Sequence, residues 1–391
     1  MARKVKQNVI YMGLASLFTD ISSEMIFPIL PLFLVSILGA NMAIVGLIEG
    51  IAEGTASILK TFSGWISDKL RKRKLFMIIG YGISALTKPF LALSYIWQHI
   101  LGVRFFDRVG KGIREPPRDA LIAASAAKKI RGKSFGIHRM MDTMGAIIGT
   151  LISFYLLSRF AASASTYKLI FWLAFIPAVI AVLIIIFFVK DVKKAVDKIK
   201  EFKLNFKLFN KNFKIFIFVT VLFNLGYFSY AFFILRAKDM GVAIALIPII
   251  YLVYHIFNAV SNVPFGELSD KIGRKKVLSL GYIIFGLVCL GFAYAFDSIF
   301  VWLLFAAYGV AVAIVNTISR AFVSDMVPFY KRGTALGIYH TFAGFAVFLA
   351  SFVAGNLWNL IDAKIAFLYA TVLAITAGIL LYLFVKEKVS K

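Results

Sequence analysis

The stretch RFFDRVGKGIREPPRD, residues 104–119, decides how this chain folds, because charged side chains are dense in it and absent from both of its flanks. A solvated loop would tolerate these charges. In the centre of a bilayer each charge costs about 2.5–3.5 kcal/mol, so it needs a partner, a wet cavity or neutralisation by a proton. The rest of the chain decides between the two environments.

The composition places the chain in a membrane. Of its 391 residues 61% are hydrophobic and only 16% are charged, and the mean hydropathy is +0.86. A soluble protein is about a quarter charged. The apolar runs are about 20 residues long, enough to cross a hydrocarbon core as helix. We predict an all-α membrane protein with twelve spans, at residues 8–37, 42–64, 75–96, 100–124, 135–158, 168–189, 214–235, 244–265, 277–296, 299–324, 334–358 and 364–385.

The distribution of basic residues predicts the orientation. The net charge of +25 would suggest nucleic acid for a soluble chain, but here the basic residues gather in alternate gaps between apolar runs. With both termini cytoplasmic, about 30 of them lie inside and about five outside. We therefore predict a multi-pass plasma-membrane protein that meets anionic headgroups at its cytoplasmic face and binds no nucleic acid. The single cysteine, Cys289, excludes an internal disulfide and a cysteine metal cluster.

Two short motifs occur twice at nearly the same offset. GWISDK at residues 64–69 recurs as GELSDK at 266–271, and RGKSFGI at 131–137 recurs as RGTALGI at 332–338. Two landmarks at one offset indicate a duplicated six-helix unit. We predict an N-terminal bundle over residues 1–189 and a C-terminal bundle over 214–391. The basic linker between them, residues 190–213, is expected to form an interfacial helix.

These motifs resemble those of the major facilitator superfamily. Its loop signature, Gly-x-x-x-Asp-(Arg/Lys)-x-Gly-(Arg/Lys)-(Arg/Lys), is matched fully in the second half and with Arg71 in place of the second glycine in the first half. Residues 108–112, RVGKG, are similar to the Arg-x-x-Gln-Gly signature of the fourth span, with Lys111 in place of glutamine. Gly145 and Gly149 fit the glycine-rich fifth span of antiporters, although its proline is missing.

The resemblance implies two six-helix bundles around a central cavity, lined mainly by spans 1, 4, 7 and 10, that opens alternately to each side. It also implies a conformational clasp in the repeated loops. Glycine there lets helix ends approach closely, and aspartate accepts hydrogen bonds from a helix N-terminus or pairs with a nearby base. The predicted clasp residues are Gly64, Asp68, Lys69, Gly266, Asp270, Lys271, Gly273 and Arg274.

Charges inside the predicted spans lie almost entirely in the first half. Two carboxylates one helical turn apart in a low dielectric cannot both stay ionised cheaply, so one of them is a natural proton carrier. Asp20 and Glu24 form such a pair on span 1, and Glu49 and Glu53 form another on span 2. A static ion-pair network is the alternative. The proton-coupling or substrate candidates are Asp20, Glu24, Glu49, Glu53, Arg108, Lys111 and Asp142, with Arg108 as the modulating charge.

The neighbouring residues receive structural roles. Gly46, Gly50 and Gly54 form a ridge suited to close helix packing, and His138, Asp142, Gly145 and Gly149 form a stripe on span 5. We expect Lys88 to form a structural ion pair, Arg118 and Asp119 to support the loop clasp, and Pro116-Pro117 to kink or break span 4. In the second half the predicted polar cavity residues are Asn224, Tyr227, His255, Asn258, Asn316 and Arg320.

Three functions remain open at this point. The first is a secondary transporter of a small organic solute, working as a monomer, with the proton gradient as its energy source, no cofactor, and antiport or efflux favoured. The second is a transporter of a metal cation or chelate that uses the N-half carboxylates as ligands, although no dedicated metal site is predicted. The third is an intramembrane enzyme, which the absence of Gly-x-Ser-x-Gly, His-Glu-x-x-His and P-loop motifs disfavours.

Overall fold

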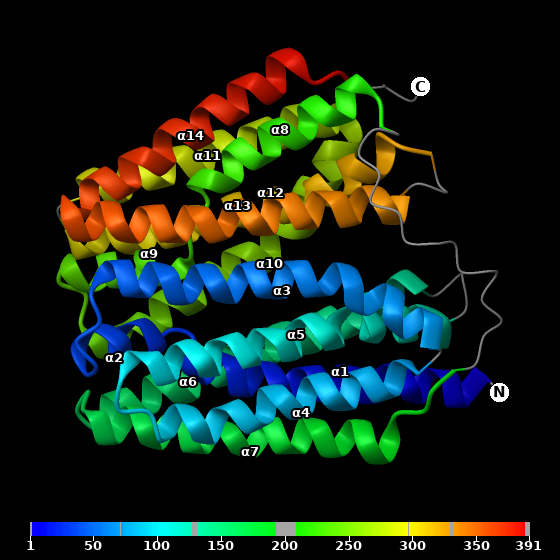
Figure 1. Cartoon of the computed structure of the whole chain (residues 1–391), viewed down its shortest axis with the longest axis horizontal. Coiled ribbons are helices and arrows are strands. Elements are labelled where there is room, and N and C mark those ends of the chain that lie inside the picture. Colours follow the sequence, from blue (N-terminus) through cyan, green and yellow to red (C-terminus); the bar gives the residue numbers. More distant parts are fainter. Residues whose placement is uncertain are drawn as a thin grey trace. The chain divides into compact units, whose positions relative to one another are not determined.

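The computed structural model describes residues 2–70, 72–126, 131–192, 209–295, 297–328 and 332–387, apart from the side chains of residues 2–6, 65, 68 and 131. All regular elements in these ranges are helices (Figure 1). The first half holds α1 (Ala2–Ile26), α2 (Leu30–Ser36), α3 (Met42–Leu70), α4 (Arg73–Ala92), α5 (Trp97–Ser125), α6 (Arg131–Arg159) and α7 (Ala164–Phe188). The second holds α8 (Lys211–Gly226), α9 (Tyr230–Asp239), η3 (Ile244–Leu246), α10 (Ile247–Ile272), α11 (Arg274–Tyr294), α12 (Ser298–Asp325), α13 (Arg332–Leu360) and α14 (Ala363–Phe384).

Each of the twelve predicted spans is helical. Within the described residues, 11 helical segments are long and apolar enough to cross a bilayer. The twelfth span is α5, which is 29 residues long but carries too many charged residues to count as an apolar helix. The all-α fold class is thereby confirmed. Spans 1 and 7 differ from the prediction because each consists of two helices, α1–α2 and α8–α9.

Contacts divide the chain into two compact units. The first comprises Met1–Ala40, Thr55–Glu201 and Ile244–Ile249, and the second comprises Asn41–Gly54, Phe202–Ala243 and Ile250–Lys391. The start of α3 thus belongs with the second unit. The boundaries predicted at 1–189 and 214–391 stay a prediction, as does the interfacial helix, because residues 193–208 of the linker lie outside the described part of the chain.

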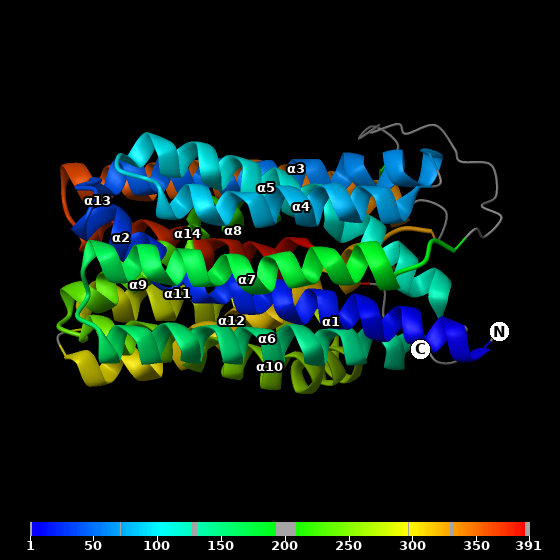
Figure 2. The same cartoon turned by 90° about the horizontal axis from the view of Figure 1, so that it is seen from below.

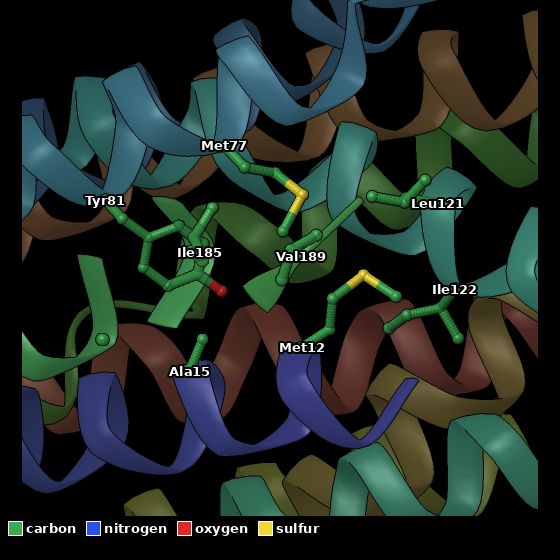
Figure 3. Close-up of a cluster of buried hydrophobic side chains, with 9 residues drawn as sticks. Met12, Ala15, Met77, Tyr81, Leu121, Ile122, Ile185 and Val189 are labelled. Atoms are coloured by element: carbon green, nitrogen blue, oxygen red, sulfur yellow. The ribbon is translucent and has the colours of Figure 1, made fainter. Parts of the chain in front are cut away.

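The core of the first unit is a cluster of apolar side chains from α1, α4, α5 and α7. Met12 of α1 meets Met77 of α4 and Leu121 of α5, and Ile185 of α7 lies beside them (Figure 3). All four are fully buried. The cluster anchors the charged helix α5 within the unit, so its charges are held on a packed scaffold.

Glycines bring α1 and α6 unusually close, as the predicted stripe on span 5 requires. A methyl group at Gly145 or Gly149 would collide with the backbone oxygens of Leu17 and Ile21, respectively, on α1. These two helices lie side by side (Figure 2). Because these two glycines have no side chain, α1 and α6 pack closely enough for their polar residues to meet.

The glycine ridge of span 2 packs inside the second unit. Gly46 faces the backbone of α13 at Ser351, and a methyl group there would lie 3.1 Å from the Cα of Gly355. Gly50 faces the backbone oxygen of Phe348, which a methyl group at Gly50 would approach to 2.8 Å. The prediction of close helix packing along this ridge is confirmed, with α13 as the partner.

The double proline does not break α5. Pro116 has no N–H to give to the carbonyl of Gly112 one turn earlier. That carbonyl instead accepts a hydrogen bond of 2.7 Å from the hydroxyl of Ser63 on α3. The helix therefore runs unbroken from Trp97 to Ser125, and the predicted break is wrong because a neighbouring helix satisfies the freed carbonyl.

Each unit ties the start of its first span to the end of its last. In the first unit the side-chain amide of Asn8 donates to the backbone oxygen of Lys190 (3.0 Å) and accepts from its N–H (2.9 Å). In the second unit Asn212 makes the same pair of bonds with Lys386, both at 2.7 Å. This duplication supports the internal repeat independently of the sequence motifs.

Candidate functional site

The breaks in spans 1 and 7 occupy equivalent places in the two repeats. Span 1 breaks after Ile26, where Pro28 and Pro31 remove backbone donors, and span 7 breaks after Gly226. The two positions differ by about the offset of the repeated motifs. Interrupted spans at corresponding places in two halves mark the binding region of many transporters, because unwound backbone offers polar groups within the membrane.

The break in span 7 holds a buried carboxylate. Glu49 of α3 is 1% exposed and accepts a hydrogen bond of 2.9 Å from the hydroxyl of Ser229, which directly precedes α9. The same hydroxyl accepts the N–H of Ala231 (3.3 Å), and the N–H of Ser229 donates to Ser351 of α13 (3.1 Å). Helix capping therefore fixes the Ser229 hydroxyl in the orientation that faces Glu49.

Tyrosines surround this carboxylate region within the second unit. Tyr227, in the break itself, is hydrogen-bonded to Tyr308 of α12 and lies within electrostatic reach of Glu53 and of Tyr254 on α10. The rings of Tyr254 and Tyr308 stack with 4.9 Å between centroids. The structure thus brings together Glu49, Glu53 and Tyr227 from the predicted site residues.

The other polar candidates of the second half are spread along their helices. His255 contacts the ring of Tyr254 at 5.0 Å, which places it at the edge of the tyrosine group. Asn258 donates to the backbone oxygen of Gly309 (3.3 Å), and Asn224 donates to a carbonyl of its own helix α8 (2.7 Å). Asn258 and Asn224 therefore contribute to packing between or within helices. Asn316 and Arg320 are exposed on α12.

The break in span 1 faces buried bases. The guanidinium carbons of Arg104 and Arg108 lie 5.4 Å and 5.0 Å from the ring centre of Phe27, which sits in the break. Both arginines are 2% exposed. Cations over an aromatic face are stabilised by its quadrupole. The two breaks thus differ in charge, with guanidinium groups at the first and a carboxylate at the second.

Several other charges of the first unit form ion pairs. Lys88 of α4 pairs with Asp107 of α5 at 3.0 Å, and both are buried, which confirms the structural pair predicted for Lys88. Lys111 lies 3.8 Å from Glu115, which also pairs with Lys60 of α3 at 2.7 Å. The buried pair of Lys88 and Asp107 joins α4 to α5 and is costly to break.

A further polar group joins α1, α5 and α6. Asp20 lies within electrostatic reach of Asp142, Glu24 and Arg118. Glu24 is buried. Arg118 donates to Ser16 of α1 (3.2 Å) and pairs with Asp119 (3.0 Å). Its expected support of the loop clasp stays a prediction, because the side chain of Asp68 lies outside the described residues. Two of the predicted coupling residues, Asp20 and Asp142, are therefore close together in the structure.

The repeated loop of the second half forms an ion-paired group at the start of α11. Arg274 pairs with Asp270 at 3.0 Å and with Asp325 of α12, which it contacts at shorter range. Gly273 has φ +104°, which favours glycine. The carboxylate of Glu387 accepts the N–H of Arg274 (2.6 Å), so it caps the N-terminus of α11 where an aspartate of the motif was expected.

The loop of the first half is described only in part. The side chain of Asp68 lies outside the described residues, so its role as a clasp stays a prediction. Gly64 lets α3 approach α5, because a methyl group at this position would lie only 3.2 Å from the Cβ of Pro116. Lys69 and Lys271 are exposed, and Gly266 makes ordinary contact with α12. Only the second-half loop is thus seen as a network of paired charges.

Three residues of this region were missed in the sequence. Ser229, Tyr254 and Tyr308 line the carboxylate region, but serine and tyrosine are common in membrane helices and no spacing singles them out. The signal for Ser229 was a Gly-Tyr-Phe-Ser run, residues 226–229, within an apolar segment. A helix stop followed by an N-cap residue predicts a break there.

The described residues hold twelve helical spans, a duplicated six-helix unit and buried charges at paired helix breaks. Together these features define a multi-pass membrane transporter. The chain belongs to the Major Facilitator Superfamily, whose family model matches residues 12–253 and 215–391. It is 42% identical over 387 residues to the MFS-type transporter MJ1317 of Methanocaldococcus jannaschii, covering 97% of this chain and 95% of the relative.

Two further comparisons extend this likeness. The chain is 25% identical over 396 residues to the quinolone resistance protein NorA of Staphylococcus aureus, covering 98% of this chain and 97% of NorA. The crystal structure of the nucleoside transporter NupG aligns with a TM-score of 0.79 at 16% identity, covering 97% of this chain and 99% of NupG. The second likeness concerns the fold alone.

Proposed function

We propose that this protein is a proton-coupled antiporter of the plasma membrane that exports a small aromatic compound carrying a basic amine. The observation that carries the proposal is Glu49, a buried carboxylate in a membrane-spanning helix that contacts the break of span 7 through Ser229. An ionisable group inside a membrane is expensive and marks a functional site by default.

The chemistry of Glu49 suits reversible protonation. A neutral hydroxyl donates to it, and the side chain is 1% exposed, so its ionised form bears the cost of burying a charge. Glu53 lies one turn further along α3, and two neighbouring carboxylates in a low dielectric favour the state that shares one proton. An arriving cation would displace that proton, because it supplies the positive charge that the pair needs.

The tyrosines indicate the class of solute. Tyr227 lies within electrostatic reach of Glu53, and Tyr254 and Tyr308 belong to the same aromatic group. Aromatic faces favour flat rings and cations, and a carboxylate favours a protonated amine. The similarity to a quinolone resistance protein over nearly the whole chain supports an aromatic solute and export.

The metal-transport alternative finds less support. Among the described residues, no group of three or more His, Cys, Asp or Glu side chains is arranged to hold a metal ion. Cations such as Ca²⁺ or Mg²⁺ take six or more oxygen ligands, some of them water. The neighbours of Glu49 and Glu53 include the hydroxyl of Ser229 and the aromatic ring of Tyr227, which suit an organic solute better.

The test uses purified protein in proteoliposomes and a fluorescent quinolone as the probe. We expect accumulation of the quinolone when a pH gradient is imposed and little without one. Glu49→Gln should abolish the effect of the gradient, because the amide carries no exchangeable charge, while exchange without a gradient persists. Glu267→Gln, at an exposed position of α10, is the control and should behave as the wild type. Equal gradient dependence in the wild type and Glu49→Gln would overturn the proposal.

A further inference from the structure

A histidine–aspartate pair lies in the first unit, apart from the carboxylate of span 7. His138 of α6 is 4% exposed, and its Nδ1 lies 3.3 Å from Oδ2 of Asp142 one turn further on. Asp142 is also hydrogen-bonded to Ser16 of α1, which accepts from Arg118 of α5. The pair is therefore fixed by contacts from three helices.

The contacts define the protonation pattern of the imidazole. A carboxylate is an acceptor only, so Nδ1 must carry the hydrogen that reaches Asp142. Nε2 of the neutral ring then carries a lone pair. Among the residues that the structure describes, Nε2 of His138 has no hydrogen-bond partner, and neither has Oδ1 of Asp142. Buried polar atoms are nearly always satisfied, so two open atoms in one pair need an explanation.

The charges around the pair come from two neighbouring helices and from α6 itself. From α1, Asp20 lies within electrostatic reach of Asp142. From α5, Arg118 lies within reach of Asp142, and Arg114 within reach of Asp20. On α6, Arg139 lies 3.8 Å from Asp142 and is largely exposed. The pair therefore lies among charges of both signs, the carboxylate of Asp20 and three guanidinium groups.

The remaining neighbours of α6 add no charge near the pair. The helix α7 carries one charged residue, Lys168, which lies over the ring of Tyr95 at 3.7 Å. The short helix η3 carries none. Among the described side chains, Asp20, Arg114, Arg118 and Arg139 are thus the charged groups that these contacts place around the pair of His138 and Asp142.

We propose that His138 and Asp142 form a second proton-binding site, in which the coupled proton is taken up at Nε2 of His138 and held as an imidazolium–carboxylate pair. The step moves one proton and breaks no other bond. His138 lies seven residues beyond the start of α6, about 10 Å along the helix axis, at the end where basic residues predict the cytoplasm. The site would therefore exchange its proton with the cytoplasmic side.

The inference rests on the proposed proton coupling and adds the residue that releases or receives the proton at one face. Glu49 would then exchange its proton for the solute, and His138 would exchange a proton with the cytoplasmic side. The close packing of α1 on α6 at Gly145 couples the position of α1 to the pair, because a methyl group at Gly145 would lie 3.0 Å from the Cβ of Asp20. A shift of α1 along α6 would alter the distance from Asp20 to the pair.

The first experiment measures protonation directly and needs no solute. The full-length protein, labelled with [¹⁵N]histidine and placed in lipid bilayers, is followed by solid-state NMR across the range in which histidine titrates, about pH 5 to 8. The signal of His138 is assigned by its loss in His138→Gln. We expect it to change from the Nδ1–H tautomer to the imidazolium as the pH falls. A signal that stays in one form across this range would overturn the inference.

The second experiment separates this inference from the proposed function. Quinolone accumulation in proteoliposomes is compared for the wild type, His138→Gln and His99→Gln, the last being an exposed control on α5. We expect His138→Gln to lose most of the gradient-driven accumulation yet keep exchange at equal pH. Wild-type gradient dependence that persists unchanged in His138→Gln would overturn the second site alone. A wild type without gradient dependence would overturn the proposed function, and the coupling role of His138 with it.

Discussion

A single methyl group on the glycine ridge of α3 should destabilise the second unit. In Gly46→Ala the added carbon would meet the backbone oxygen of Ser351 and lie 3.1 Å from the Cα of Gly355. The obstacle is backbone, which cannot rotate away as a side chain does, so α3 and α13 must move apart. Overpacking of this kind costs about 1–3 kcal/mol.

The matched control is Gly82→Ala on α4, where a built Cβ has nothing within 4 Å. Alanine is a better helix former than glycine by about 0.8–1.0 kcal/mol, and this gain is common to both variants. The difference between the two variants therefore isolates the cost of the clash. Gly355→Ala, which meets the backbone of α3 from the other side, should resemble Gly46→Ala.

The single cysteine supplies the assay. Cys289 is fully buried in α11, within the same unit as the ridge, so a thiol-reactive dye reports unfolding on heating. Gly46→Ala should label at a clearly lower temperature than the wild type, and Gly82→Ala at the same or a higher one. Labelling of Gly46→Ala at or above the temperature of Gly82→Ala would refute the close packing of α3 on α13.

Three further predictions concern buried polar contacts and use thermal unfolding followed by loss of the monodisperse peak on gel filtration. Lys88→Met leaves Asp107 buried without its cation and should cost about 3–5 kcal/mol, whereas replacing both residues by apolar ones should recover most of that loss; an unstable double variant would contradict this. Ser63→Ala removes the donor to the carbonyl of Gly112 and should cost about 1 kcal/mol, and no loss would mean that the freed carbonyl is satisfied elsewhere. Asn212→Ala breaks two backbone contacts and should cost about 1–3 kcal/mol, more than Asn212→Asp, which keeps one acceptor.

The twelve spans were predictable because the membrane imposes one rule on every span. Length and apolarity are enough for eleven of them, and the duplicated motifs place the twelfth, α5, despite its charges. The close packing at Gly46 and the structural ion pair of Lys88 were also predictable. Small residues in membrane helices favour close helix contacts, and a charge buried in a membrane needs a partner.

The breaks in spans 1 and 7 were not predicted, because apolarity continues across them. Pro28 and Gly226 are compatible with a continuous span, and the signal at residues 226–229 lies within an apolar segment that reads as one span. The opposite error occurred at Pro116, where the missing N–H predicted a kink or a break. The hydroxyl of Ser63, from a distant part of the sequence, keeps the helix whole.

The sequence predicted which residues belong to the candidate site, but not which of them contact one another. Glu49 and Glu53 were expected to act together from their spacing, but the hydroxyl of Ser229 that contacts Glu49 lies 180 residues further along the chain. The pairing of His138 with Asp142 follows from helical spacing, whereas the approach of Asp20 depends on how α1 packs on α6. Such contacts depend on packing between helices, which no local pattern encodes.

The central claim is that Glu49 carries a proton that an arriving solute displaces. The most direct measurement is proton release into a lightly buffered detergent solution, followed with a pH-sensitive dye, when a quinolone is added to the wild type and to Glu49→Gln. We expect release by the wild type and markedly less by Glu49→Gln, because the amide has no proton to lose at neutral pH. Equal release by both proteins, or none by either, would contradict it.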